Sequence, residues 1–202
     1  GGSLKWCREA LYGGETPQND AYPRINKEIE AGAKDPTGLI FLPYMAGERA
    51  PIWDPNARGT FMGLNMNTTR AEMLRAVMEG TSFALQDNLD QAIKTGIPIR
   101  DFICCGGCSK SDIWLKIKAS VIGQEIKIPS VNLGAPGGLG YMNAAFMGEY
   151  KTPEDASRAA LQIKKIVEPV EEWIPIYKEL YQIYLDSYQS LKSQFAALAQ
   201  IK

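Results

Sequence analysis

Hydrophobic residues along the chain alternate between the spacing typical of helices and that typical of strands. Apolar positions three or four residues apart, bounded by glycine, proline or capping residues, predict helices over residues 3–11, 22–33, 69–94, 109–122 and 139–148. Short apolar runs between turn-forming residues predict buried strands at residues 39–42, 102–105 and 125–128. Since strands and helices follow one another, the pattern predicts an α/β domain with helices on a largely parallel sheet.

The longest predicted helix carries two specific signals. Thr69 and Glu72 are spaced as a capping box, in which the hydroxyl and the carboxylate each bind the other residue's backbone N–H. Gly80 lies in the middle of this helix, where glycine costs about 1 kcal/mol relative to alanine. We therefore expect a neighbouring element to approach the helix closely at Gly80.

The spacing of apolar residues over 170–200 predicts one long C-terminal helix or two. Their tyrosines, at positions 177, 181, 184 and 188, recur at helical spacing. The simpler interpretation is a half-buried aromatic face packed on its own domain. The alternative is a face for oligomerisation or for a noncatalytic assembly partner.

Composition and charge exclude several classes of protein. The 202 residues are 45% hydrophobic and 22% charged with a net charge of −1, which argues against disorder and against a nucleic-acid partner. The chain has no histidine, which excludes Ser-His-Asp catalysis and an imidazole base within it.

No apolar run approaches the roughly 20 residues of a membrane span. No secretory leader is visible, and the few clustered cysteines suit a reducing compartment, so we expect a cytoplasmic location. The first residue is not methionine, so the sequence could be a segment of a longer chain.

The turn between the predicted strand at 102–105 and the next helix is the sharpest candidate site. Gly106 and Gly107 would let a ligand lie against bare backbone, and the N–H groups at the helix start favour anionic or acceptor atoms. A nucleotide-binding edge is one interpretation. The other is a tight turn, with Ser109 and Asp112 capping the helix.

Cys105 and Cys108 form a C-x-x-C pattern at the same turn. A helix N-terminus can lower a thiol pKa there, so a dithiol redox protein is the alternative function from another class. A metal site is the weaker reading, because a second ligand pair at suitable spacing is absent from the sequence.

Residues 47–59 have no regular period and combine charges, an aromatic side chain and turn formers. This composition is typical of a functional loop, and equally of a structural turn in which Arg49 or Arg58 pairs with a carboxylate. Glu48, Asp54 and Glu72 are candidate bases by residue type, but their spacing pairs no two of them as an acid and a base.

Several of these motifs, in this order, resemble the C-terminal domain of the FGGY family of carbohydrate kinases. The loop from Gly47 to Gly63 is similar to a loop of that family, and residues 59–79 resemble its second signature. Residues 105–111, followed by Trp114, resemble its Gly-Gly-x-x-x-Ser nucleotide segment. The opening Gly1 to Trp6 resembles its Gly-x-x-x-x-Trp helix start, and residues 139–145 resemble its later Leu-Gly-x-Ala helix. The loop residues are most similar to the xylulokinase and gluconokinase branch.

The resemblance implies an actin-like, ribonuclease H-like ATPase domain, the C-terminal half of a sugar kinase, with helices on a mixed sheet that lacks its first strands. It implies residues 1–169 as the nucleotide-side domain and residues 170–202 as a helical extension. It also implies ATP with Mg²⁺, a sugar or polyol as acceptor, an N-terminal sugar-binding domain as partner, and a possible homodimer. The implied cofactor-binding residues are Gly1, Lys5, Gly106, Gly107 and Ser111.

No catalytic residue is implied in this segment, because the catalytic aspartate and the phosphate loops of the family precede the region of resemblance. Phosphoryl transfer depends mainly on positioning, Mg²⁺ and an acceptor for the hydroxyl proton. We therefore expect these 202 residues alone to bind adenine nucleotide weakly or not at all, and not to phosphorylate sugar.

Overall fold

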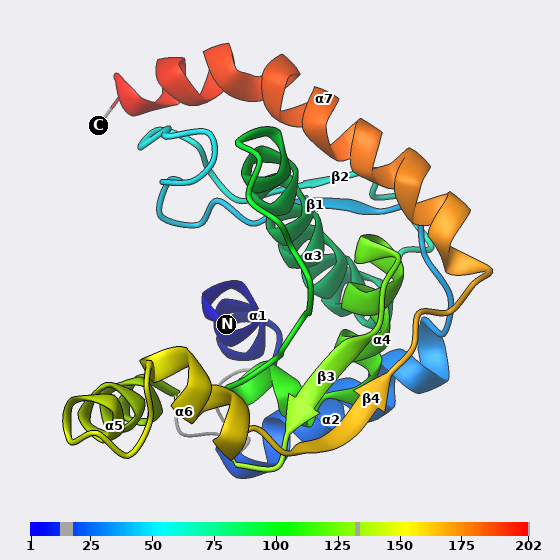
Figure 1. The fold of residues 1–202 in the computed structure, drawn as a ribbon. Coiled ribbons are helices and arrows are strands. Elements are labelled where there is room, and N and C mark those ends of the chain that lie inside the picture. The colour runs from blue at the N-terminus through cyan, green and yellow to red at the C-terminus, as the bar shows by residue number, and fades with distance from the viewer. Residues whose placement is uncertain (13–17, 132–133, 202) are drawn as a thin grey trace.

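The computed structural model describes residues 1–12, 18–131 and 134–201. The fold has two parts, called bodies here, each built around its own hydrophobic core. Helix α3, Arg70–Lys94, runs through the centre of the larger body (Figure 1). The predicted capping box begins it: Thr69 Oγ1 accepts from the Glu72 backbone N–H, and the Glu72 carboxylate accepts from Thr69 N at 2.6 Å. The predicted start of this helix is thus confirmed.

Strand β1, Ile40–Leu42, is fully buried and crosses α3 at Gly80. A Cβ built on Gly80 would lie 2.1 Å from the carbonyl oxygen of Phe41, so only glycine lets the strand approach the helix this closely. The predicted close approach is confirmed. Strand β2, Thr60–Met62, pairs antiparallel with β1.

Helices α1, Gly2–Tyr12, and α2, Gln18–Gly32, pack on the N-terminal half of α3 (Figure 1). Glu28 of α2 receives two hydrogen bonds from the Arg70 guanidinium and one from the Tyr12 hydroxyl. These bonds tie α1, α2 and the start of α3 together.

The second body is smaller. It is built from the turn η1, Gly107–Lys110, helix α4, Asp112–Ile122, and strands β3, Ile126–Pro129, and β4, Ile163–Val167. β3 and β4 pair antiparallel and cover one side of α4. Apolar side chains from these elements form a second core cluster, made of Leu115, Ala119, Ile126, Ile128 and Val167.

The predicted buried strand at residues 102–105 is wrong. This stretch makes a single parallel bridge, from Ile103 to Lys127, and Ile103 is 46% exposed. Gly106, with a φ of 82°, then turns the chain before a ladder can form. Among the described residues the expected largely parallel sheet is not found, since the pairs β1–β2 and β3–β4 are both antiparallel.

Helices α5, Gly134–Phe146, and α6, Pro153–Ala160, contact each other and project from one end of the fold (Figure 1). Most of α5 is exposed, including the apolar side chains of Leu139, Met142 and Phe146.

Helix α7, Trp173–Ala199, is one continuous helix that lies along β1 and α4. Tyr177, Tyr184 and Tyr188 are buried in the larger core, and the Tyr184 and Tyr44 hydroxyl oxygens lie 2.6 Å apart. The tyrosines therefore pack on the body of the protein, as the simpler interpretation expected. The proposed boundary at residue 170 stays a prediction. No helix among the described residues is long and apolar enough to cross a membrane.

Candidate functional site

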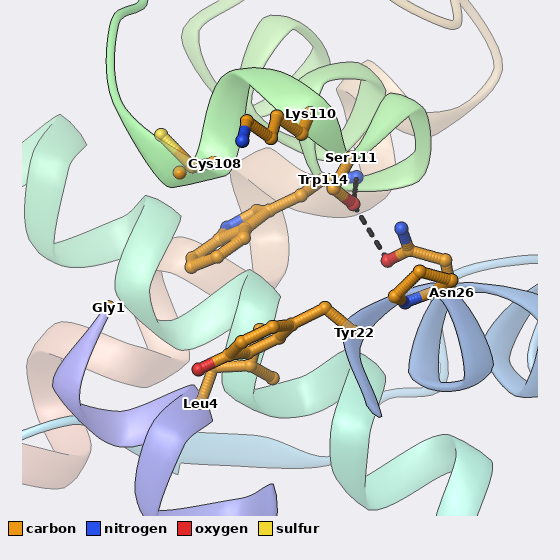
Figure 2. A pocket seen from close by; sticks show the side chains of 10 residues that line it. Gly1, Leu4, Tyr22, Asn26, Cys108, Lys110, Ser111 and Trp114 are labelled. Atoms are coloured by element: carbon orange, nitrogen blue, oxygen red, sulfur yellow. Dashed lines mark hydrogen bonds between the residues drawn. The ribbon is translucent and has the colours of Figure 1, made fainter. Parts of the chain in front are cut away.

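A cavity of about 550 Å³ opens between the start of α1, helix α2, the turn η1 and the start of α4 (Figure 2). Its volume is within the range of small-molecule sites. Ten residues line it: Gly1, Leu4, Tyr22, Pro23, Asn26, Gly107, Cys108, Lys110, Ser111 and Trp114.

Two aromatic rings form facing walls of this cavity. Figure 2 shows the Trp114 ring, from α4, on the side opposite the Tyr22 ring, from α2. Trp114 is only 6% exposed, and its indole N–H has no hydrogen-bond partner among the described residues. Leaving a buried N–H unpaired costs about 1–3 kcal/mol.

Ser111 fixes the position of α4 relative to α2. Its hydroxyl accepts a hydrogen bond from the Trp114 backbone N–H and donates one to Asn26 Oδ1 at 2.9 Å (Figure 2). Ser111, rather than Ser109, is therefore the N-cap of α4.

The predicted cap at Ser109 and Asp112 is wrong because the turn η1, which begins at Gly107 and contains Ser109, precedes the helix. Ser109 donates to the Gly106 carbonyl within that turn, and Asp112 forms an ion pair with Lys165 at 2.8 Å. The helix thus begins after Ser111 instead of directly after the glycines.

The two glycines at the turn have different roles. Gly106, at a φ of 82°, adopts a left-handed backbone that favours glycine, and it does not line the cavity. Gly107 does line the cavity, and a Cβ built on it would meet no atom within 4 Å. Gly107 therefore exposes bare backbone to open space.

Three of the five predicted binding residues, Gly1, Gly107 and Ser111, meet at this cavity. Gly106 adjoins it through Gly107. Lys5 is exposed on α1, with its Nζ 3.9 Å from Glu9, and is not among the lining residues. A nucleotide contact for Lys5 stays a prediction.

Sequence reasoning did not assign Tyr22, Asn26 or Lys110 to the site. Lys110 adjoins the glycine turn and could have been included from that position. Tyr22 and Asn26 had no local signal, because α2 reaches the cavity only through tertiary packing.

The charge of the lining favours an electron-rich ligand. Lys110 is the charged side chain among the ten lining residues, and none of them is acidic. The start of α4 adds the positive end of a helix dipole. Among the described residues no group of three or more histidine, cysteine, aspartate or glutamate side chains could hold a metal ion.

The cysteines pair differently from the expected C-x-x-C arrangement. Cys108 Sγ lies 3.3 Å from Cys104 Sγ, whereas Cys105 is exposed and offers Cys108 only its backbone carbonyl, at 3.6 Å. The redox pair predicted at Cys105 and Cys108 is therefore wrong in its first member. Side chains of neighbouring extended residues point to opposite sides, so when η1 returns the chain it meets Cys104 and not Cys105.

The loop at residues 47–59 contributes nothing to the cavity lining, and its best candidate base is used structurally. Asp54 accepts hydrogen bonds from the Asn56 backbone and from Tyr188. Burial raises the pKa of Asp54, but these hydrogen bonds outweigh burial and leave the pKa below its usual value. Arg58 donates to the carbonyl of Pro55, and Glu72 belongs to the capping box of α3. These contacts support a structural turn, but among the described residues neither Arg49 nor Arg58 forms the predicted ion pair with a carboxylate.

Residues 1–149 match the sequence model described as "FGGY family of carbohydrate kinases, C-terminal domain". The chain belongs to this FGGY family. It is 29% identical over 201 residues to the xylulose kinase of Staphylococcus epidermidis and 26% identical over 212 residues to the gluconokinase of Bacillus subtilis. These alignments cover 100% and 97% of this chain but only 40% and 39% of the two relatives.

Solved structures of FGGY kinases share the fold. The xylulose kinase of Brucella ovis is 30% identical, with a TM-score of 0.83 over 96% of this chain and 38% of its own. The gluconate kinase of Lactobacillus acidophilus is 29% identical, with a TM-score of 0.82 over 97% of this chain and 39% of its own. The chain therefore has the fold of the C-terminal domain of an FGGY carbohydrate kinase, and it spans about two fifths of these relatives.

Proposed function

We propose that this chain is the nucleotide-side part of an ATP-dependent carbohydrate kinase, which transfers the γ-phosphoryl group of ATP to a hydroxyl of a sugar or polyol. Xylulose is the first candidate acceptor, and gluconate or another polyol is the alternative. Support comes from the family match and from relatives named as xylulose kinase and gluconokinase. An N-terminal domain, present in the longer relatives, would bind the sugar.

The cavity is the proposed site for the adenosine part of ATP. The observation that carries this proposal is the bare backbone of Gly107 at a cavity walled by Tyr22 and Trp114 (Figure 2). A purine between the two rings would gain stacking energy, and each stacked base is worth about 1–3 kcal/mol in nucleic-acid complexes.

Lys110 and the start of α4 are the proposed contacts for the phosphate side of the nucleotide. Both place positive charge at the cavity, and neither is opposed by an acidic lining residue. Mg²⁺ neutralises charge on the transferring phosphoryl group in such enzymes. We propose that the nucleotide phosphates and residues outside this chain hold the Mg²⁺, since the described residues offer no metal-binding cluster.

The substitution Gly107→Trp in the complete gene product tests the site. An indole is similar in size to adenine, and a side chain at Gly107 starts in open space, so the variant should fold and fill the cavity. We expect the KM for ATP to rise at least about tenfold, equivalent to about 1.4 kcal/mol, with the KM for the sugar nearly unchanged. ADP release, coupled to a dye reaction, would measure both constants.

Gln124→Trp is the matched control, because Gln124 is exposed just beyond the other end of α4 and does not line the cavity. It should leave the KM for ATP at the wild-type value. Unchanged ATP kinetics in Gly107→Trp would refute this nucleotide site. The same assay, run with ketoses, polyols and aldonates, would identify the acceptor, and no ADP release with any of them would contradict the kinase assignment.

A cytoplasmic location and a homodimer complete the proposal. All four cysteines are free thiols, which fits a reducing compartment.

A further inference from the structure

Cys104 and Cys108 form a thiol pair that the proposed kinase reaction does not use. Their sulfur atoms are 3.3 Å apart, and both side chains are partly exposed. Cys104 precedes the Gly106 turn and packs against the smaller core cluster, whereas Cys108 lies on η1, packs against the larger core and lines the cavity. The pair therefore links the segment before the Gly106 turn to η1, at the edge of the candidate nucleotide site.

The surroundings of the pair make its two members chemically unequal. The hydrogen bond with Cys104 lowers the pKa of Cys108, and burial opposes this effect; the nearby Lys118 ammonium lowers the pKa of both thiols. The same hydrogen bond raises the pKa of Cys104. Cys108 also lines the open cavity, whereas Cys104 packs against the smaller core cluster, so a solute reaches the Cys108 sulfur more readily. Cys108 is therefore the candidate nucleophile, and Cys104 the thiol that closes the disulfide.

The exposure of the turn leaves the sulfurs room to meet. A disulfide needs an S–S distance of about 2.05 Å, so the two atoms must approach by a little over 1 Å. None of the four residues of η1 is buried, and Gly106 joins the turn to the residues before it. A small movement of η1 would close the bond without disturbing either core.

We propose that Cys104 and Cys108 are a peroxide-sensitive dithiol, in which Cys108 is oxidised by a hydroperoxide and Cys104 then closes an intramolecular disulfide. In the first step the Cys108 thiolate attacks a peroxide oxygen. The O–O bond breaks, the leaving oxygen takes a proton, and Cys108 becomes a sulfenic acid. In the second step Cys104 attacks the Cys108 sulfur, the S–O bond breaks, and the departing hydroxide leaves as water with the Cys104 proton. The two thiols lose two electrons and two protons, and the hydroperoxide is reduced to water and an alcohol, or to two waters when it is hydrogen peroxide.

Oxidation would also alter the cavity, because Cys108 and its neighbours Gly107 and Lys110 line it. Fixing Cys108 to Cys104 restrains η1 and shifts this wall. We expect the oxidised protein to bind adenine nucleotide less tightly, and a thiol reductant to restore the affinity. This consequence rests on the proposed function, whereas the disulfide itself does not.

Peptide mass mapping of the complete gene product, treated with hydrogen peroxide in the presence of dimedone, tests the dithiol. Dimedone traps sulfenic acids. The wild-type protein and Cys105→Ser should lose the mass of two hydrogen atoms, with one disulfide linking residues 104 and 108. Cys104→Ser should carry a dimedone adduct on Cys108, and Cys108→Ser should form neither an adduct on Cys104 nor a disulfide. Oxidation of Cys108 should be at least about tenfold faster than that of the exposed Cys105.

A disulfide that uses Cys105, or a Cys108 thiol that survives while Cys105 is oxidised, would overturn the proposal. Nucleotide affinity of the oxidised protein, measured by calorimetry, separates the second claim from the first. A disulfide that forms with no change in affinity would overturn the link to the cavity and leave the dithiol established. Cys104→Ser, treated in parallel, shows whether any loss of affinity requires the disulfide.

Discussion

The substitution Tyr177→Phe should destabilise the contact between α3 and α7 far more than loss of one hydroxyl ordinarily does. Arg75 and Glu79 of α3 are 0% and 1% exposed and form an ion pair at 2.7 Å. The Tyr177 hydroxyl accepts a hydrogen bond from Arg75 at 2.8 Å and donates one to Glu79 at 2.8 Å. The phenol therefore links two buried charges whose access to water is closed.

The expected loss follows from the charge of both partners. A hydrogen bond to a charged group contributes about 1.5–3 kcal/mol, and phenylalanine keeps the ring packing, so losing two such bonds costs about 3–6 kcal/mol. Tyr184→Phe is the matched control on the same helix, because Tyr184 is equally buried but, within the described ranges, shares its hydroxyl only with the neutral Tyr44. Its expected cost is about 1–2 kcal/mol.

Hydrogen exchange of the complete gene product, read by mass spectrometry on peptides from α3 and α7, measures both losses as free energies of local opening. Protection in these peptides should fall by at least about tenfold more in Tyr177→Phe than in Tyr184→Phe, which corresponds to a difference of about 1.4 kcal/mol or more. Equal losses in the two variants would refute the reasoning that the buried charges make Tyr177 special.

Two further predictions concern packing and pH. Gly80→Ala gains about 1 kcal/mol of helix propensity, but its Cβ would lie 2.1 Å from the Phe41 carbonyl, so the net loss of α3 stability should be about 2 kcal/mol or more. Gly138→Ala in α5 is the control, because a Cβ there meets nothing within 4 Å and should not destabilise its helix. Hydrogen exchange of α3 and α5 would compare the two variants. A Gly80→Ala variant as stable as the wild type would contradict the packing argument. The hydrogen bonds from Arg70 lower the pKa of Glu28 in the folded state. The ionised Glu28 carboxylate therefore stabilises the fold above its unfolded pKa of about 4.3. This stabilisation is lost as the pH falls through the pKa of Glu28 in the folded protein. Protection of α1 and α2 should therefore fall on acidification in the wild type and fall less in Glu28→Gln; the same acid response in both proteins would rule out Glu28 as its source.

Local chemistry in the sequence determined most of the helices, although not α6, and two specific features of α3. Thr69 and Glu72 bind each other's backbone within one turn, so their spacing alone predicted the start of the helix. Gly80 predicted a close neighbour because glycine has no other advantage within a helix. The glycine turn likewise predicted where bare backbone would meet a cavity, since Gly107 and Ser111 lie within five residues of each other.

Only the tertiary structure decided which side chains complete the candidate site. Tyr22 and Asn26 reach it through packing of α2, at a separation of more than 80 residues from Ser111 that no local pattern records. The partner of Cys108 was decided by the path of η1, which returns the chain toward Cys104 rather than Cys105. The antiparallel pairing of β3 with β4 depends on residues more than 30 positions apart, and exposed lysines in β4 conceal its strand pattern. Helix caps and turns are governed by hydrogen bonds between near neighbours in the sequence. The walls of the cavity and the pairing of strands depend on where distant segments meet, and the thiol pair depends on the path of the turn between them.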